Sequence, residues 1–345
     1  MVHIGVIGYG YWGPNLVRNF VESPDTQVIA VADMKSDRLQ LAARRYPGIE
    51  TVHDHRDLLK NPKIDAVAIS TPVSTHFPLA MEALQAGKHV LVEKPMTADS
   101  DQAVRLIDEA ARRNLVLMVD HTFVYTGAVR KMRDLINTGA LGDIYYYDST
   151  RVNLGLFQHD VNVIWDLAVH DLSIMDYILP EEPVEVSATG IAHVNGAEDT
   201  AFVSIFYSGS IIAHLNVNWL SPVKIRRALI GGTKSMIVYD DIEASEKIKV
   251  YDKGIDVKNG SDSLYNLMVS YRSGDIYTPR IDVTEALSIE VKHFVDCIEN
   301  GTTPITDGRA GLRVVSVLEA ATRSMKQRGR SVRCGSVPVV CATVA

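Results

Sequence analysis

The chain has 345 residues, a net charge of −7 and a hydrophobic fraction of 46%, values typical of a globular protein long enough for two domains. This acidic balance, without a basic run, disfavours nucleic acid and anionic membranes as partners. The sequence has no apolar stretch of about 18 residues and begins directly with a strand pattern, so we expect neither a membrane-spanning helix nor a signal peptide. Its three cysteines, Cys297, Cys334 and Cys341, are scattered, which predicts no metal site or disulfide framework and a cytoplasmic location.

Strand and helix patterns alternate through residues 1–122, as in a doubly wound parallel sheet of the Rossmann type. The predicted strands are Val2–Ile7, Val28–Ala32, Ile64–Ser70, His89–Val92 and Leu115–Val119, and the predicted helices are Pro14–Glu22, Ser36–Tyr46, Phe77–Ala86 and Ser100–Arg113. The sequence therefore predicts an α/β fold with an N-terminal Rossmann domain.

Residues 123–335 follow another pattern, in which several strands succeed one another without helices between them. The expected helices are Thr126–Asn137, Val163–Ile178, Thr284–Asn300 and Arg309–Lys326, and the expected strands are Asp143–Val152, Val184–Ala188, Ala201–Tyr207, Ile211–Trp219, Ile225–Ile230 and Ser235–Tyr239. Strands joined by turns predict an open, mostly antiparallel sheet in an α+β domain. The two closing helices can pack back on the first domain, and residues 336–345 form a tail.

A glycine-rich segment follows the first strand at once and leads into a helix. Gly8, Gly10 and Gly13 form the spacing G-x-G-x-x-G, with Tyr11 and Trp12 between the last two and Pro14 after them. The three glycines permit a tight turn, a close approach to a pyrophosphate and close packing of the helix. The helix N-terminus then favours phosphate, so we expect a dinucleotide here; a structural glycine turn is the alternative.

An acidic residue ends the second predicted strand. Asp33 follows Gly13 by twenty residues, the place where a carboxylate holds the ribose hydroxyls of the adenosine half. A carboxylate repels a 2′-phosphate, which favours NAD as the cofactor. Because Lys35 supplies a cation nearby, NADP stays an alternative.

Two further loops leave the carboxyl ends of predicted strands, where ligands of open α/β sheets bind. One contains Ser70, Thr71 and His76, and the other begins with Glu93 and Lys94. We expect these residues to contact the cofactor, although a capped loop and a helix-capping histidine are alternatives for the first group. Lys94 follows a nearly unbroken apolar strand and can donate to a substrate oxygen or stabilise an alkoxide, which makes it a catalytic candidate.

Asp166 and His170 stand four positions apart in the helical stretch and therefore share one face. A histidine near its ordinary pKa of about 6.5 suits general acid and base chemistry. Asp166 can orient the ring, position the substrate or form an ordinary surface pair with it. No third side chain completes a metal site with them and Asp171, so we expect no metal.

The order of these motifs resembles that of the Gfo/Idh/MocA family of oxidoreductases. Glu93-Lys94-Pro95 after the glycine fingerprint, followed by Asp166-x-x-x-His170-Asp171, carries the resemblance, and the segments 135–144 and 304–308 extend it over most of the chain. The resemblance implies a Rossmann domain, an open sheet that makes dimers or tetramers, and Lys94 with His170 as the catalytic pair, with Asp166 in the substrate site.

One departure from the family points to a branch within it. Many members place two glycines before the aspartate, whereas Val163-Ile164-Trp165 precedes Asp166 here. The stretch from Arg151 to Asp166 resembles the nucleotide-sugar branch that includes UDP-N-acetylglucosamine 3-dehydrogenases. We expect Tyr125, Arg151 and Asn153 to contact the substrate; for Arg151 an edge-strand surface charge is the alternative.

The predicted activity is NAD-dependent hydride transfer at a sugar hydroxyl, foremost at C3 of a UDP-linked N-acetylhexosamine. A ketosugar reductase, a free-sugar or inositol dehydrogenase, an NAD-dependent glycosidase and a non-catalytic regulator that binds NAD(P) stay open as alternatives.

Overall fold

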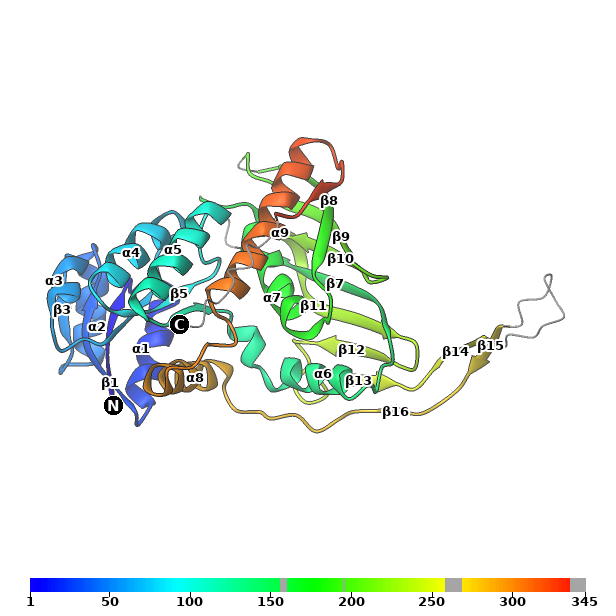
Figure 1. Cartoon of the computed structure of the whole chain (residues 1–345), viewed down its shortest axis with the longest axis horizontal. Helices are drawn as coiled ribbons and strands as arrows, with labels where there is room; N and C mark the ends of the chain where they lie inside the picture. The colour runs from blue at the N-terminus through cyan, green and yellow to red at the C-terminus, as the bar shows by residue number, and fades with distance from the viewer. Residues whose placement is uncertain (156–159, 195, 258–268, 336–345) are drawn as a thin grey trace. The chain divides into compact units, whose positions relative to one another are not determined.

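The computed structural model describes residues 1–155, 160–194, 196–257 and 269–335 (Figure 1). The chain divides into two compact units. Among the described residues, unit 1 comprises Met1–Tyr125, Thr284–Glu319 and Gly335, and unit 2 comprises Thr126–Val283 and Ala320–Cys334.

Unit 1 is built on a six-stranded parallel sheet with strand order β3-β2-β1-β4-β5-β6. Its elements are β1 (Val2–Ile7), α1 (Gly13–Glu22), β2 (Thr26–Ala32), α2 (Ser36–Arg45), β3 (Glu50–Val52), α3 (His55–Lys60), β4 (Ala66–Ile69), α4 (Val73–Gln85), β5 (His89–Glu93), α5 (Ser100–Arg113), β6 (Leu117–Asp120), the 3-10 helix η1 (Thr122–Tyr125), α8 (Ala286–Asn300) and the larger part of α9 (Gly308–Lys326). The strand order reverses direction between β1 and β4, which is the place where ligands of doubly wound sheets bind.

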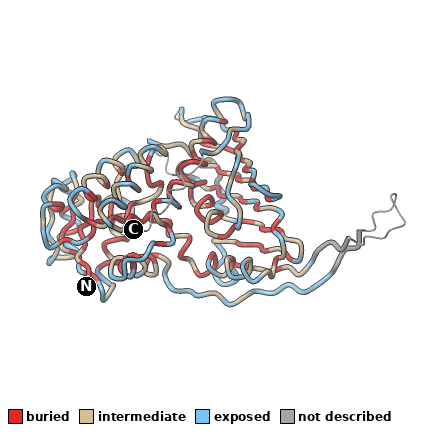
Figure 2. The backbone as a smooth tube through the Cα atoms, viewed as in Figure 1, coloured by how far each residue is buried: buried red, intermediate tan, exposed pale blue. Residues whose placement is uncertain are grey.

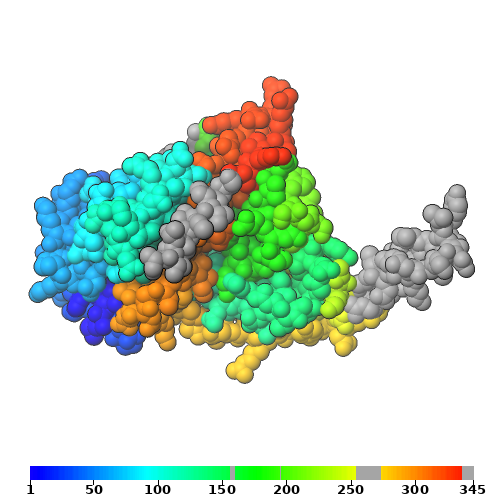
Figure 3. Space-filling model, in the orientation of Figure 1, coloured from blue at the N-terminus to red at the C-terminus, as the bar shows by residue number. Residues whose placement is uncertain are grey.

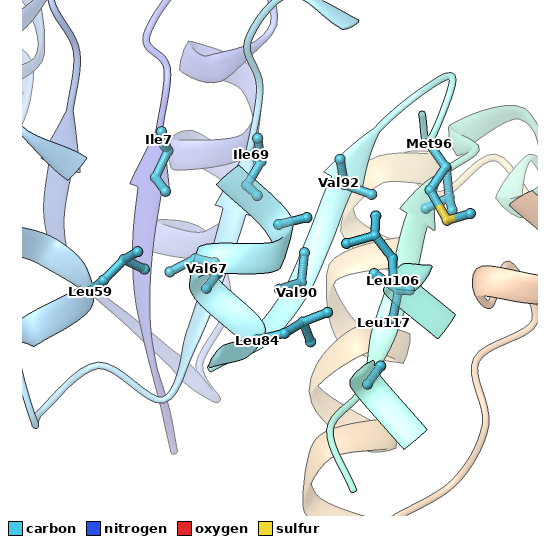
Figure 4. Close-up of a cluster of buried hydrophobic side chains, with 14 of the residues drawn as sticks. Ile7, Leu59, Val67, Ile69, Leu84, Val90, Val92, Met96, Leu106 and Leu117 are labelled. Atoms are coloured by element: carbon cyan, nitrogen blue, oxygen red, sulfur yellow. The ribbon is translucent and has the colours of Figure 1, made fainter. Parts of the chain in front are cut away.

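The strands of unit 1 are buried because helices cover the sheet, as their continuous apolar sequences predict. Figure 2 shows these strands among the buried parts of the backbone, and all four residues of β4 are inaccessible to solvent. Side chains from β4, β5, α4 and α5 make one apolar cluster, in which Val67, Leu84, Val90 and Leu106 lie close together (Figure 4). The surface of this layer, formed by α4 and α5, is drawn in cyan in Figure 3.

Unit 2 contains a nine-stranded sheet with strand order β16-β13-β12-β11-β7-β10-β9-β8-β17. Its elements are α6 (Gly127–Asn137), β7 (Ile144–Leu154), the π-helix η2 (Ile164–Ala168), α7 (Val169–Ile178), β8 (Pro183–Ile191), β9 (Thr200–Tyr207), β10 (Ile212–Asn218), β11 (Leu220–Gly232), β12 (Met236–Asp240), β13 (Ile248–Tyr251), β14 (Gly254–Val257), β15 (Val269–Arg272), β16 (Ile276–Tyr277) and β17 (Val332–Arg333). One pair, β7 with β10, is parallel, and the other neighbours are antiparallel. The strands β14 and β15 pair separately.

One face of this sheet is covered and the other is open. Along β10, Ala213, Leu215 and Val217 are fully buried, whereas Ile212 is 45% exposed, the alternation expected of a half-buried strand. The helical segment η2 contacts β10, and α6 contacts α7. The predicted fold class is confirmed in both parts.

The structure adds several elements to those predicted. The short β3 and α3 are present, with Asp54 capping α3 through the amide of Arg56. The helix predicted from Phe77 begins at Val73 instead, with Pro72 at its N-cap. Pro78 lies inside this helix and removes one internal hydrogen bond. No described helix is both long and apolar enough to cross a membrane.

Candidate functional site

The three glycines of the first loop have different surroundings. A Cβ atom at Gly8, which has φ +96°, would lie 2.2 Å from the carbonyl oxygen of Ser70, and one at Gly13 would lie 2.2 Å from that of Gly8. By contrast, a Cβ atom at Gly10 would have no neighbour within 4 Å among the described residues. Gly8 and Gly13 therefore allow close packing of the loop, while Gly10 borders a space that a pyrophosphate could fill.

Backbone amides hold the carboxylate of Asp33 at the end of β2. One oxygen accepts the N–H of Tyr9 at 2.7 Å and the other accepts that of Lys35 at 2.8 Å. Each carboxylate oxygen has a second lone pair, so Asp33 can still accept hydrogen bonds from ribose hydroxyls. Tyr11 and Met34 extend into solvent beside this loop, with 85% and 88% of their surfaces exposed. The residues present fit a dinucleotide.

His76 ties together the two loops that follow β4 and β5. Its ring is 1% exposed, with Nδ1 2.8 Å from the carbonyl oxygen of Pro95 and Nε2 2.9 Å from that of Thr71. A neutral imidazole donates to one of these oxygens and a protonated one to both. The hydroxyl of Thr75 donates to that of Thr71 at 2.7 Å, which further fixes the loop. His76 is thus placed to position the loop backbone, and its contact with the cofactor stays a prediction.

Lys94 lies just beyond β5, whose central residues Val90, Leu91 and Val92 are almost inaccessible. Glu93 and Lys94 are half-buried. The neighbouring strand β6 pairs with β5 so that Asp120 stands opposite Glu93. Parallel strands thus bring an acidic side chain next to the segment that carries the predicted catalytic lysine.

Asp166 and His170 are distinguished by their exposure. Among the residues 163–175, every position is buried except these two, which are half-buried. Asp166 lies in the π-helix η2 and His170 in the first turn of α7, so the predicted shared face is the accessible one of an otherwise buried segment. The indole N–H of Trp219 donates to the carboxylate of Asp166 at 3.0 Å and thereby fixes it.

Arg151 forms a buried ion pair directly beside His170. Its Nε donates to Asp171 at 2.6 Å, and both side chains are at most 5% exposed. Burial by itself would lower the pKa of Arg151, but the charge of Asp171 outweighs it and raises the pKa. Arg151 thus anchors the start of α7, rather than being the edge-strand surface charge that was the alternative. Its direct contact with substrate stays a prediction.

The other predicted substrate residues differ in their surroundings. Asn153 is half-buried on β7. Tyr125 is 2% exposed, and its hydroxyl lies 3.1 Å from that of Thr306. Burial raises the pKa of Tyr125 well above its ordinary value, so Tyr125 is neutral at physiological pH.

The predicted residues form two groups, each within one unit. Unit 1 holds the glycine loop, Asp33, the loop with Ser70, Thr71 and His76, and Lys94; unit 2 holds Arg151, Asn153, Asp166 and His170. Within the described ranges, no three His, Cys, Asp or Glu side chains gather as a metal-binding group.

The sequence did not indicate two residues that hold predicted site residues in place. These are Asp120, which binds Trp12, and Trp219, which binds Asp166. Asp120 ends a strand at the ligand-binding edge of the sheet, and the logic that singled out Lys94 could have found it. Trp219 pairs with a residue 53 positions earlier, and no local signal in the sequence indicates that contact.

The fold and the glycine loop define a dinucleotide-binding oxidoreductase, and comparison with known proteins gives its family. The model described as "Oxidoreductase family, NAD-binding Rossmann fold" matches residues 2–121, and the one described as "Oxidoreductase family, C-terminal alpha/beta domain" matches residues 133–333. The chain belongs to the Gfo/Idh/MocA oxidoreductase family and binds NAD through its Rossmann domain.

Two characterised relatives match nearly the whole chain. A UDP-N-acetylglucosamine 3-dehydrogenase of Acidithiobacillus ferrooxidans is 28% identical over 326 residues, covering 92% of this chain and 95% of the relative. A myo-inositol 2-dehydrogenase of Thermotoga maritima is 26% identical over 349 residues, covering 97% and 99%. A solved structure of the UDP-N-acetylglucosamine 3-dehydrogenase from A. ferrooxidans is 27% identical, covers 94% of this chain and 99% of that one, and gives a TM-score of 0.76.

Proposed function

We propose that this protein is an NAD-dependent dehydrogenase that oxidises a CH–OH group of a sugar, foremost C3 of a nucleotide-linked sugar such as a UDP-N-acetylhexosamine. The observation that carries the proposal is the exposure of Asp166 and His170 alone in a buried helical segment of unit 2, in a chain whose unit 1 holds a dinucleotide loop and Lys94. The similarity to a UDP-N-acetylglucosamine 3-dehydrogenase supports the choice of sugar.

The residues have separate tasks in this reaction. Gly10 and the N-terminus of α1 hold the pyrophosphate, and Asp33 holds the adenosine ribose. Bound NAD supplies the hydride acceptor. His170 takes the proton of the substrate hydroxyl as the C–H bond breaks and the carbonyl forms. Lys94 donates a hydrogen bond to the same oxygen, where negative charge develops. Asp166, held by Trp219, orients a neighbouring hydroxyl or the ring of His170.

The substrate is tested by following NADH across a panel of free and UDP-linked sugars, with the oxidised carbon of the product assigned by NMR. We expect NADH formation foremost with a UDP-linked N-acetylhexosamine, and a product oxidised at C3. The panel contains myo-inositol because the second relative is named for it. If only inositol is oxidised, the substrate is inositol and not a nucleotide-linked sugar. If no compound in the panel gives NADH, the proposal that the protein is an enzyme is wrong.

The catalytic roles are tested with Lys94→Met and His170→Ala. Each variant should lower kcat by about 100- to 10,000-fold, the range of a lost acid–base or electrostatic group. The NADH dissociation constant, measured by fluorescence titration, should change little. Unchanged turnover in both variants would remove these two residues from the mechanism.

The role of Asp33 predicts the selectivity for the cofactor. Asp33→Ala removes the acceptor for the ribose hydroxyls and the charge that repels a 2′-phosphate. We expect NAD to bind about tenfold more weakly, the equivalent of one hydrogen bond of about 1.4 kcal/mol, while NADP binding is unchanged or improves. Titration with both cofactors measures this, and equal losses would reject the role in selectivity.

The open face of the sheet in unit 2 suggests a second copy of the chain as partner. Phe206 and Ile212 are cross-strand neighbours on β9 and β10, and both are more than 40% exposed; Phe202 stacks on His214 nearby. Burying these side chains favours a homodimer or homotetramer. Light scattering should show such an oligomer, and Phe206→Glu should shift it towards monomer.

A further inference from the structure

A buried acidic residue that the reaction above does not use connects the two parts of the site in unit 1. Asp120 is 2% exposed and ends β6, opposite Glu93 of β5. One carboxylate oxygen accepts the indole N–H of Trp12 at 2.6 Å, and the other accepts the hydroxyl of Thr122 at 2.5 Å. Trp12 belongs to the glycine loop and is the N-cap residue of α1. The carboxylate therefore fixes that loop from a strand 108 positions away.

The same carboxylate lies within the electrostatic field of Lys94. Burial raises the pKa of Asp120, and the hydrogen bonds with Thr122, Trp12 and Glu290 and the positive charge of Lys94 offset that rise only in part. The positive charge of Lys94 therefore favours the charged form of Asp120. Asp120 thus combines a contact to the cofactor loop with an interaction with the lysine.

A second buried acid interacts with Asp120. Glu290 of α8 is inaccessible to solvent. Its burial, together with the charge of Asp120, raises the pKa of Glu290 well above its ordinary value. Two buried carboxyl groups that interact titrate as a coupled pair. Because Trp12 and Thr122 donate hydrogen bonds to Asp120, the charged form is favoured on Asp120 over Glu290.

We propose that Asp120 is a positioning residue of the oxidoreductase site, which holds Trp12 in the cofactor loop and balances the charge of Lys94 through one buried carboxylate. The inference deepens the proposed function and rests on the role given there to Lys94. It assigns to Asp120 no contact with substrate or cofactor. Its consequence is that cofactor affinity and turnover both depend on this carboxylate.

The first test compares Asp120→Asn, which keeps the size of the side chain and removes its charge, with Trp12→Phe, which removes the indole N–H. Each should raise the NADH dissociation constant about tenfold, the equivalent of one charge-assisted hydrogen bond of about 1.4 kcal/mol. The double variant should lose little more than either single variant, because both remove the same contact. Additive losses would show that Trp12 does not act through Asp120.

The second test separates positioning from a purely structural role. Asp120→Asn should lower kcat about 10- to 100-fold, the size of effect that misplacing a catalytic group produces, with the sugar that the panel identifies as substrate. Asp120→Glu should restore part of kcat, because it restores the charge. Glu290→Gln should lower kcat less than Asp120→Asn, because the hydrogen bond from Trp12 goes to Asp120.

The control is Asp199→Asn in unit 2, where another buried carboxylate accepts hydrogen bonds, here from His193. It should lower the melting temperature without changing kcat or the NADH dissociation constant. If Asp120→Asn behaves in the same way, the inference fails while the proposed function stands. If Lys94→Met retains turnover, the proposed role of Lys94 fails first, and the NADH titrations alone then test the contact between Asp120 and Trp12.

Discussion

Each unit fixes a carboxylate with an indole N–H, but the two carboxylates have opposite surroundings. In unit 1 Trp12 donates to Asp120 at 2.6 Å, and in unit 2 Trp219 donates to Asp166 at 3.0 Å. Asp120 is buried, whereas Asp166 is half-buried. The same kind of contact thus stabilises the buried carboxylate of Asp120 in unit 1 and orients the accessible carboxylate of Asp166 in unit 2.

The difference follows from the elements that carry the two residues. Asp120 ends a strand of a parallel sheet whose two faces are covered, so its side chain is enclosed. Asp166 lies in the π-helix η2, a wider turn that is often found at functional sites. Its neighbours Trp165 and Leu167 are buried, so Asp166 reaches solvent only along one side of the segment. A buried charge therefore supports the site in unit 1, and an accessible one is presented in unit 2.

The largest expected effect comes from removing one of the buried charges of unit 2, that of Arg151. Arg151→Met leaves Asp171 buried without its charged partner, which should lower the free energy of unfolding by about 3–5 kcal/mol. Urea denaturation followed by circular dichroism measures the loss. The control, Arg112→Met, breaks a pair in which the arginine side chain is 62% exposed, and should leave the urea midpoint unchanged. Equal midpoints for the two variants would contradict a structural role for the Arg151 pair.

A smaller effect concerns His121, which follows Asp120 in unit 1. Burial, assisted by the charge of Lys94, lowers the pKa of His121 to about 3, whereas an unfolded histidine has a pKa of about 6.5. The unfolded chain therefore binds a proton that the folded chain does not, and the contribution to stability is complete above pH 6.5 and lost as the pH falls towards 3.

We therefore expect His121→Gln to reduce the loss of stability between pH 7 and pH 4 by about 3 kcal/mol. Urea denaturation at a series of pH values measures this slope. The exposed His53 provides the control, since His53→Gln should not alter the slope. If His121→Gln loses as much unfolding free energy between pH 7 and pH 4 as the unmodified protein, His121 is protonated in the folded protein.

The sequence predicted the parts of this comparison that depend on local patterns. Gly8, Gly10 and Gly13 indicated the dinucleotide loop because their spacing is contiguous and follows a strand. Asp166 and His170 were placed on one helical face by their separation alone, and the structure shows that this face is the accessible one. Periodicity and spacing carry this information because they act over a few residues.

The supporting contacts were not predicted, since they join residues far apart in the chain. Asp120 and Trp12 are 108 positions apart, and Arg151 and Asp171 are 20 apart on a strand and a helix. The sequence marks Arg151 only as a charge on a strand, for which exposure is the ordinary expectation. Which charge finds a buried partner depends on the packing of whole elements, and no local pattern specifies that.

The smallest effect is expected for Trp219→Phe, which tests whether the indole of Trp219 has a different role from that of Trp12. Phenylalanine is smaller than the fully buried indole and lacks the N–H that holds Asp166, so the melting temperature should fall moderately. The less constrained carboxylate should lower kcat/KM for the sugar about tenfold, the cost of about 1.4 kcal/mol for a hydrogen bond to a charged group. The NADH dissociation constant should be unchanged, in contrast to Trp12→Phe. Measuring both constants for both variants therefore shows whether the two indole contacts serve different ligands; a common loss of NADH affinity would mean that they do not.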